Sequence, residues 1–338
     1  MTDPSLDPPQ WQDLATAGQA APSFHNTQPW TFRALSGAQR LQVYADTRRA
    51  LPAGDPDGRA LHISVGAALF NIRVAAERLG WEPSVRLLPD AAKPFLLAEI
   101  DLLARAPGAE PHGPDLYPAI WQRHSSRQPF ANRDVPEAVL GELIEAARAE
   151  GADFCPLEEA DVRRVMDLTA EAEERINDDP ARRAETQRWL RGREKAPDGI
   201  PADALGPPDR EAHVPMRSFT GTPPAPGVRS ERFEPLPQLA TLTTHGDEPA
   251  DWLRVGQAVE RVWLLATVHG LRAGLLQQAV EWPDTRWGLR DPTAGPGHVQ
   301  TVMRLGFGPP GPLTGRRPVA DVLELVDESA HLRTTEHG

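Results

Sequence analysis

Two segments of this chain match each other at an offset of 190 residues, which carries Gly66 to Gly256 and Gly80 to Gly270. Each segment has apolar residues at three- and four-residue spacing, which indicates an amphipathic helix, and each ends at a glycine, a common helix stop. The early glycine and alanine positions predict a helix face that packs very closely against a neighbour. The other matched pairs are Ala68 and Ala258, Leu69 and Val259, Ile72 and Val262, and Ala76 and Ala266.

The flanking elements also match in order. A strand-like run precedes each helix, at 41–45 and 238–243, and a further strand follows each after a connection, the second at 299–307. This agreement favours duplication of one α/β unit over chance similarity between two amphipathic helices. We therefore expect an α+β fold with antiparallel-rich sheets, helices packed on them, and two halves related by pseudo-two-fold symmetry.

We place the boundary between the halves near residue 110, so that residues 1–110 form the first half and 111–338 the second. Proline is unusually frequent, at 36 residues, and residues 195–238 are rich in Pro, Gly and Arg. So long a loop in a compact domain is either disordered or a functional cover. We take 195–238 as a candidate lid.

Composition excludes several classes of function. The net charge of −12 lacks the basic excess of a nucleic-acid-binding protein. The single cysteine, Cys155, excludes an intrachain disulfide and disfavours a cysteine-rich metal site, and His269 and His298 have no partner at metal-ligand spacing. We expect no metal. The N-terminus has no signal-peptide pattern and no segment suits a membrane span, so we expect a cytoplasmic protein.

The proline-bearing loop at residues 21–30 is the strongest candidate for a binding segment. Its prolines restrict the backbone, and Ser23, Asn26 and Gln28 offer neutral hydrogen-bond donors and acceptors. The pyrimidine edge and ribityl chain of a flavin need mixed polar partners of this kind. The alternative is a capped turn between a helix and a strand, and His25 is better explained as a structural histidine than as a base.

A second candidate segment has Arg123, Ser125 and Arg127 at alternate positions. In extended backbone alternate side chains point the same way, so two guanidinium groups and a hydroxyl could hold a phosphate and an adjacent polar ring edge. The alternative is a solvated surface cluster. Arg316 and Arg317 could add phosphate charge or be two exposed arginines in the tail.

Other chemistries have little support in the sequence. Neither a Walker loop nor a dinucleotide-binding glycine pattern is present. The serines at 23, 125 and 126 lack the context of a nucleophile elbow. Because each candidate segment occurs once, we expect one complete site per chain, between the halves, and a monomer in which the fusion replaces a homodimer interface.

Taken together, these residues resemble the nitroreductase family of FMN proteins, specifically its fused Acg-like branch. The resemblance covers about residues 10–325. Its most specific parts are the loop at 21–30 and the segment at 123–127; the helix from Gly256 to Gly270 and the terminal Arg-Arg-Pro support it. It implies that FMN binds between the halves, where ordinary members bind it between two subunits.

The resemblance also implies roles for individual residues. Arg123 and Ser125 would contact the phosphate or ribityl chain, Arg127 would contact the pyrimidine ring, and Arg316 or Arg317 would complete the phosphate clamp. Leu276 and Gln277 would run under the N5 edge of the flavin, and the loop would line the opposite side. The residues expected from that loop are Pro22, Ser23, Phe24, Asn26 and Gln28.

The function implied is an FMN-dependent NAD(P)H oxidoreductase that reduces a nitroaromatic, a quinone or a similar acceptor. The flavin N5 carries this chemistry, so no side chain is expected to be catalytic. One departure concerns Gln277 and Gln278, which stand where the family usually has an acidic residue and a glycine. The alternatives are a non-catalytic protein that sequesters FMN under the lid and a degenerate structural protein without a cofactor.

Overall fold

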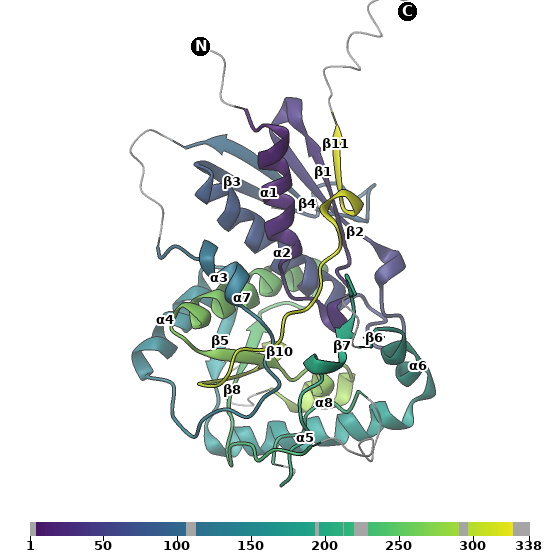
Figure 1. Ribbon diagram of the computed structural model, residues 1–338, viewed down its shortest axis with the longest axis vertical. Coiled ribbons are helices and arrows are strands. Elements are labelled where there is room, and N and C mark those ends of the chain that lie inside the picture. The colour runs from purple at the N-terminus through teal and green to yellow at the C-terminus, as the bar shows by residue number, and fades with distance from the viewer. Residues whose placement is uncertain are drawn as a thin grey trace, which may run out of the picture.

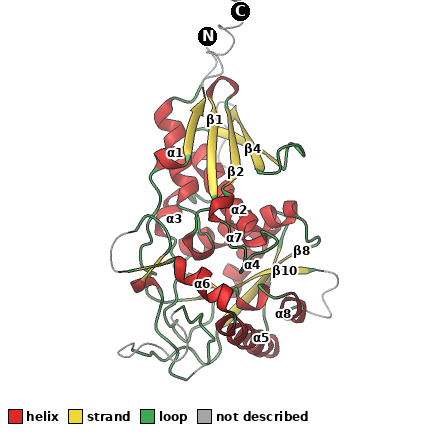
Figure 2. Cartoon of the chain, turned by 90° about the vertical axis from the view of Figure 1, so that its right-hand side faces the viewer, coloured by secondary structure: helices red, strands yellow, loops and turns green. Residues whose placement is uncertain are grey.

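The computed structural model describes residues 5–105, 113–192, 196–211, 213–219, 229–290 and 297–326. The described residues form two larger sheets with helices between and around them, as Figures 1 and 2 show, and one two-stranded sheet. The parts of the candidate lid at 195, 212 and 220–228 lie outside the described residues.

The first half begins with a helix and contributes four antiparallel strands to a five-stranded sheet of order β11-β1-β2-β4-β3. Asp7 caps the first helix, since its side chain accepts a hydrogen bond from Gln10 N. The elements are α1 (Pro8–Gln19), β1 (Trp30–Leu35), β2 (Arg40–Ala45), α2 (Arg59–Arg78), β3 (Trp81–Leu87) and β4 (Leu96–Ala104).

The second half forms a four-stranded antiparallel sheet of order β5-β8-β10-β9. A highly charged region of this half is divided between two helices, because Pro180 interrupts it. The elements are α3 (Tyr117–Gln122), α4 (Glu137–Arg148), β5 (Asp153–Pro156), α5 (Glu159–Asp178), α6 (Pro180–Arg188), β6 (Leu190–Arg191), β7 (Ile200–Pro201), β8 (Gln238–Thr244), α7 (Pro249–Val268), β9 (Arg272–Leu275), α8 (Pro283–Gly288) and β10 (His298–Gly306).

The two halves repeat one topology. Both contain a helix, two strands, a second helix and two more strands, and β1-β2-β4-β3 corresponds in spatial order to β5-β8-β10-β9. The second helices, α2 and α7, each have 20 residues and begin and end at the same 190-residue offset. The second half has three additions: α3 before the repeat, α5, α6 and the segment around β6 and β7 between its first two strands, and α8 between its last two strands. The prediction of an α+β fold in two related halves is confirmed.

Helices α2 and α7 pack on each other between the sheets (Figure 2). The matched glycines meet at the crossing: a Cβ on Gly66 would lie 2.3 Å from Leu253 O, and one on Gly256 would lie 2.2 Å from Ile63 O. Both positions therefore exclude any side chain. The main hydrophobic core continues from one half into the other through these helices.

The C-terminal segment joins the halves a second time. After β10 the chain leaves the second sheet and reaches the first, where β11 (Leu323–Val326) pairs in parallel with β1, Phe32 opposite Leu323 (Figure 1). This route carries Arg316 and Arg317 past the loop at 21–30. In the described part of the chain no helix is long and apolar enough to span a membrane.

Candidate functional site

The loop at 21–30 has a constrained backbone. It contains a short 3-10 turn at Phe24–Asn26, and three of its non-glycine residues have positive φ: His25 at 50°, Asn26 at 54° and Gln28 at 51°. Such conformations persist only where the surroundings hold them. The Ser23 hydroxyl accepts a hydrogen bond from Gln28 N at 2.9 Å and so closes the loop on itself.

The segment 123–127 lies against the edge of β9. Ser126 N donates a hydrogen bond to Ala273 O at 2.9 Å, and a Cβ on Gly274 would lie 2.6 Å from Ser126 O. The missing side chain at Gly274 therefore allows the two backbones to approach. Arg123, Ser125 and Arg127, the three residues that the alternation predicts, all reach one cavity, but His124 reaches it as well and Ser126 lines a second cavity.

Two adjoining cavities lie between the loop and this segment. Five residues line both of them: Pro22, Ser23, His25, Ser125 and Arg127. The smaller cavity is completed by Asn26, Arg123, His124, Ile200, Ala204, Thr314 and Arg316. The larger extends along α2, α7 and the end of β9, where Phe24, Leu276 and Gln277 line it. The structure thus brings together most of the candidate residues from three distant parts of the chain.

The smaller cavity is strongly cationic. Arg123 and Arg316 both donate hydrogen bonds to Ala20 O, at 2.7 and 2.9 Å. Burial and the neighbouring Arg123 lower the pKa of Arg316 to about 9, so it carries its charge at neutral pH. Burial and the same arginines lower the pKa of His124 to about 4, which leaves it neutral. The cavity suits an anion.

The larger cavity combines aromatic and cationic groups. The Arg127 guanidinium lies 5.0 Å from the centre of the Phe219 ring and donates to Ala204 O at 2.6 Å. Burial and the charge of Arg217 lower the pKa of Arg127 to about 10. Gln277 donates to Thr301 Oγ1 at 2.7 Å, while its own Oε1 is buried and has no hydrogen-bond partner among the described residues.

A buried carboxylate closes one side of the larger cavity. Glu281 forms ion pairs with Arg182, at 3.1 Å, and with Arg217. Burial raises the pKa of Glu281 and the two arginines oppose that effect. Arg217 also lies 5.5 Å from the centre of the Phe24 ring, so it joins the insertion of the second half to the loop of the first.

Residues 196–211 and 213–219, here called the cover segment, lie across both cavities. Ile200 and Ala204 line the smaller one, and Met216, Arg217 and Phe219 line the larger. Inside the segment Ile200, Ala204 and Phe219 form a small hydrophobic cluster. This part of the candidate lid is therefore packed against the cavities, whereas no residue of 229–238 lines them.

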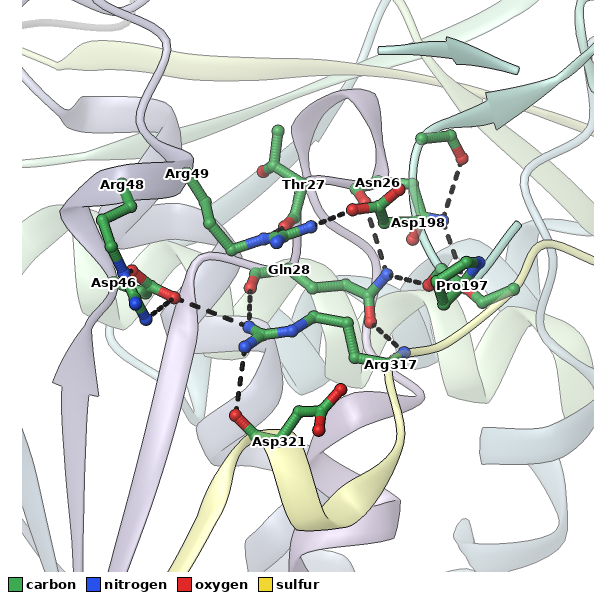
Figure 3. Close-up of polar contacts among 12 residues, drawn as sticks. Asn26, Thr27, Gln28, Asp46, Arg48, Arg49, Pro197, Asp198, Arg317 and Asp321 are labelled. Atoms are coloured by element: carbon green, nitrogen blue, oxygen red, sulfur yellow. Dashed lines mark hydrogen bonds and ion pairs between the residues drawn. The ribbon is translucent and has the colours of Figure 1, made fainter.

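Polar contacts fasten the cover segment to the loop (Figure 3). Asn26 Nδ2 donates to Gly199 O at 2.9 Å, and Gln28 Nε2 donates to Pro197 O at 2.8 Å. The carboxylate of Asp198 pairs with Arg49 and, at 2.7 Å, with Arg191. These contacts stabilise the loop conformation whose positive φ angles would otherwise be unfavourable.

Two candidate residues do not line either cavity. The fully buried Gln28 uses its side chain to bind Pro197 and the backbone N of Arg317, at 2.9 Å. The Arg317 guanidinium donates to Gln28 O and Asp321 O and lies 3.7 Å from the Asp46 carboxylate (Figure 3). Both residues join the C-terminal segment to the loop. The adjacent Arg316 lines the smaller cavity and also joins the loop, since it donates to Asn26 Oδ1 at 3.2 Å and to Ala21 O at 3.3 Å.

The structure adds charged residues that sequence reasoning did not single out. Glu260 pairs with Arg123 behind the smaller cavity, and Glu281 pairs with Arg217 at the larger one. Glu260 lies on the apolar face of its helix, and a charge on such a face is the signal that could have identified it. Glu281 lies in irregular backbone, where no periodicity marks it.

No family model matches the chain. It is 32% identical over 331 residues to the Mycobacterium tuberculosis protein named "Putative NAD(P)H nitroreductase Rv3131", covering 93% of this chain and 91% of that protein. It is 28% identical to "Putative NAD(P)H nitroreductase acg" of the same organism, covering 94% of each. A solved nitroreductase with bound FMN from Bacteroides fragilis is 15% identical, with a TM-score of 0.39, covering 64% of this chain and 100% of that one. This chain belongs to the nitroreductase family.

Proposed function

We propose that the two adjoining cavities bind one FMN and that the protein is an FMN-dependent NAD(P)H oxidoreductase. The observation that carries the proposal is the joining of a cationic cavity, which suits a phosphate, to a larger aromatic one, which suits a flat ring. Five shared lining residues connect them, as an intact flavin mononucleotide requires. The names of the relatives, which refer to NAD(P)H nitroreductases, support the same reading.

The residues of the smaller cavity fit a phosphate. Arg316 has a buried Nε that lacks a hydrogen-bond partner among the described residues, whereas the buried Nε of Arg123 lies 3.2 Å from Glu260 Oε1. Unpartnered guanidinium donors next to a cavity are what a phosphate would satisfy. Ser23, Ser125 and Thr314 offer hydroxyl groups nearby for phosphate or ribityl oxygens.

The residues of the larger cavity fit a flavin ring. Arg127 provides a charge suited to a pyrimidine carbonyl, and the unpartnered Oε1 of Gln277 can accept from a ring N–H. Trp263 and Ile63 supply apolar surface from α7 and α2. When bound, FMN supplies hydride acceptance and donation, so the side chains would bind, orient and exclude water.

We further propose that a nitroaromatic, a quinone or a similar small aromatic acceptor is reduced. The larger cavity reaches the aromatic and cationic lining at Phe24, Phe219 and Arg217, which suits a flat, electron-poor ring. Gln277 is neutral where an acidic residue is usual in the family, so its effect on the flavin differs from that of a carboxylate. The cytoplasmic location and the boundary of the halves near residue 110 stay predictions.

The cover segment favours a second candidate function, which is FMN sequestration without turnover. It lies over both cavities and is fastened by Asp198 and by the pair of Arg217 with Glu281. A cover that stays closed would hold the flavin and keep an acceptor out. The two functions use the same residues and differ in whether the cover opens.

An absorbance spectrum of the purified protein, before and after anaerobic addition of NADPH or NADH, tests both candidates. A flavin spectrum that bleaches within seconds, and recovers with a nitroaromatic or quinone, supports the oxidoreductase. A flavin spectrum that stays oxidised with both nicotinamides supports sequestration. A colourless protein that takes up no added FMN contradicts both.

A further inference from the structure

Glu260 is a buried carboxylate that the proposed function does not use. It lies on α7, its side chain is 0% exposed, and it does not line either cavity. We propose that Glu260 is a positioning residue for Arg123 and that it takes up one proton when the phosphate of FMN enters the smaller cavity. This inference rests on the proposed FMN binding.

The geometry places Glu260 directly behind the phosphate-binding arginine. Its Oε1 lies 3.2 Å from Arg123 Nε, and the Arg123 side chain is only 2% exposed. The Arg123 guanidinium also lies 5.0 Å from the centre of the Trp263 ring, which belongs to the same helix as Glu260. The carboxylate and the ring thus fix the guanidinium between α7 and the cavity.

Three groups from three other elements face Glu260. Arg123 comes from the end of α3, Arg316 from the C-terminal segment, and the neutral amide of Asn71 from α2. Neither carboxylate oxygen has a well-formed hydrogen bond among the described residues. Burial raises the pKa of Glu260, while Arg123, Asn71 and Arg316 lower it. The ionised carboxylate therefore depends on its two arginines.

The charges around Glu260 link the binding of the phosphate to the protonation of this carboxylate. Without a ligand, Arg123 and Arg316 supply two positive charges and Glu260 one negative charge, while His124 is neutral. Arg127 also lines the smaller cavity and stays charged, so a phosphate dianion would bring the charges of the whole cavity to zero. Next to Glu260, however, the dianion adds a like charge and competes for the Arg123 guanidinium. Protonation of Glu260 would remove that buried like charge and leave Arg123 to the phosphate.

The phosphate itself is the other group that could take the proton. Its second pKa is about 6, so at pH 8 the free ligand is almost entirely a dianion. A proton taken up at pH 8 must then appear either on Glu260 or on the bound phosphate. The two sources are distinguished by removing the titratable group at position 260.

The experiment is titration calorimetry at pH 8 with the flavin-free protein, in two buffers of different ionisation enthalpy. We expect uptake of about one proton per FMN and none for riboflavin, which lacks the phosphate. Glu260→Gln should abolish the uptake while still binding FMN. The control is Glu150→Gln, because Glu150 also pairs two arginines, Arg73 and Arg261, but lies away from both cavities.

Each outcome decides the inference. FMN binding without proton uptake overturns it and leaves the proposed function intact, as does uptake that persists in Glu260→Gln. Failure of both flavins to bind contradicts the proposed function as well. If Glu260→Gln does not fold, the wild-type infrared difference between FMN and riboflavin complexes decides: a new protonated-carboxyl band supports the inference, and its absence overturns it.

Discussion

Gly66 and Gly256 meet at the crossing of α2 and α7, where a Cβ on Gly66 would lie 2.9 Å from the Cα of Gly256. These two residues are also the first matched pair of the internal repeat. The contact that joins the two halves is therefore made by residues at equivalent positions of the repeat. It brings α2 and α7 close enough for both to line the larger cavity.

The first prediction concerns this contact. Gly66→Ala should lower the free energy of unfolding by about 1–3 kcal/mol, because the added methyl meets the backbone oxygen of Leu253. The matched control is Gly141→Ala in α4, where a Cβ meets nothing within 4 Å. That variant should gain roughly 0.5–1 kcal/mol. Urea titration measures both, and equal stability of the two variants would contradict the packing argument.

The second prediction concerns oligomeric state. Since α2–α7 packing and the pairing of β11 with β1 already join the halves within one chain, we expect a monomer. Light scattering on the eluted protein should give a mass near 37.0 kDa at all tested concentrations. A concentration-independent mass of twice that value would show that the fused halves still require a partner.

The third prediction separates two adjacent arginines. Arg316→Ala should weaken FMN binding roughly 10- to 150-fold, because a hydrogen bond to a charged group contributes about 1.5–3 kcal/mol. Riboflavin binding should change little, since the loss is at the phosphate end. Arg317→Ala should lower the melting temperature through its lost contacts with Gln28 and Asp46, but leave FMN affinity within a few-fold. Fluorescence titration of both flavins tests this, and an equal loss of affinity in the two variants would refute it.

Sequence patterns recover much of the fold and of the site, for physical reasons. The repeat identifies α2 and α7 because their apolar spacing and small residues reflect direct packing. The alternation at 123–127 identifies Arg123, Ser125 and Arg127, which all line the smaller cavity. His124 also lines that cavity and Ser126 lines the larger one, so alternation alone does not select the cavity residues.

Long-range placement is what the sequence leaves open. The strands β5, β9 and β11 have four residues each, too few for a clear pattern, so their pairing is visible only in three dimensions. Gln28 and Arg317 have side chains of the kind that bind a flavin or a phosphate. In the structure, however, the Gln28 side chain binds the C-terminal segment and the Arg317 side chain binds the loop. Likewise, the residues next to Glu260 in the sequence do not indicate that its partner is Arg123, which belongs to a distant element.

The fourth prediction concerns the cover segment. Asp198→Asn removes the charge that pairs with Arg49 and Arg191, so the segment should open more often. We expect hydrogen exchange of residues 196–211 to accelerate several-fold in flavin-free protein, and FMN to dissociate faster. The control is Asp203→Asn, an exposed residue of the same segment that should change neither rate. Unchanged exchange in Asp198→Asn would show that the remaining contacts alone hold the cover.

The fifth prediction is the pH dependence of the same attachment. Burial raises the pKa of Asp198, but hydrogen bonds from Arg191 and Arg49 outweigh it, so the pKa lies below the ordinary value. A carboxyl whose folded pKa is lowered stabilises the folded form fully above its unfolded value, about 3.9, and less as the pH falls through the folded value. The protection of residues 196–211 against hydrogen exchange, measured relative to that of α7, should thus be constant from pH 7 to about 5 and decline below about 4. In Asp198→Asn this local decline should be absent; its persistence would assign the acid sensitivity to another group.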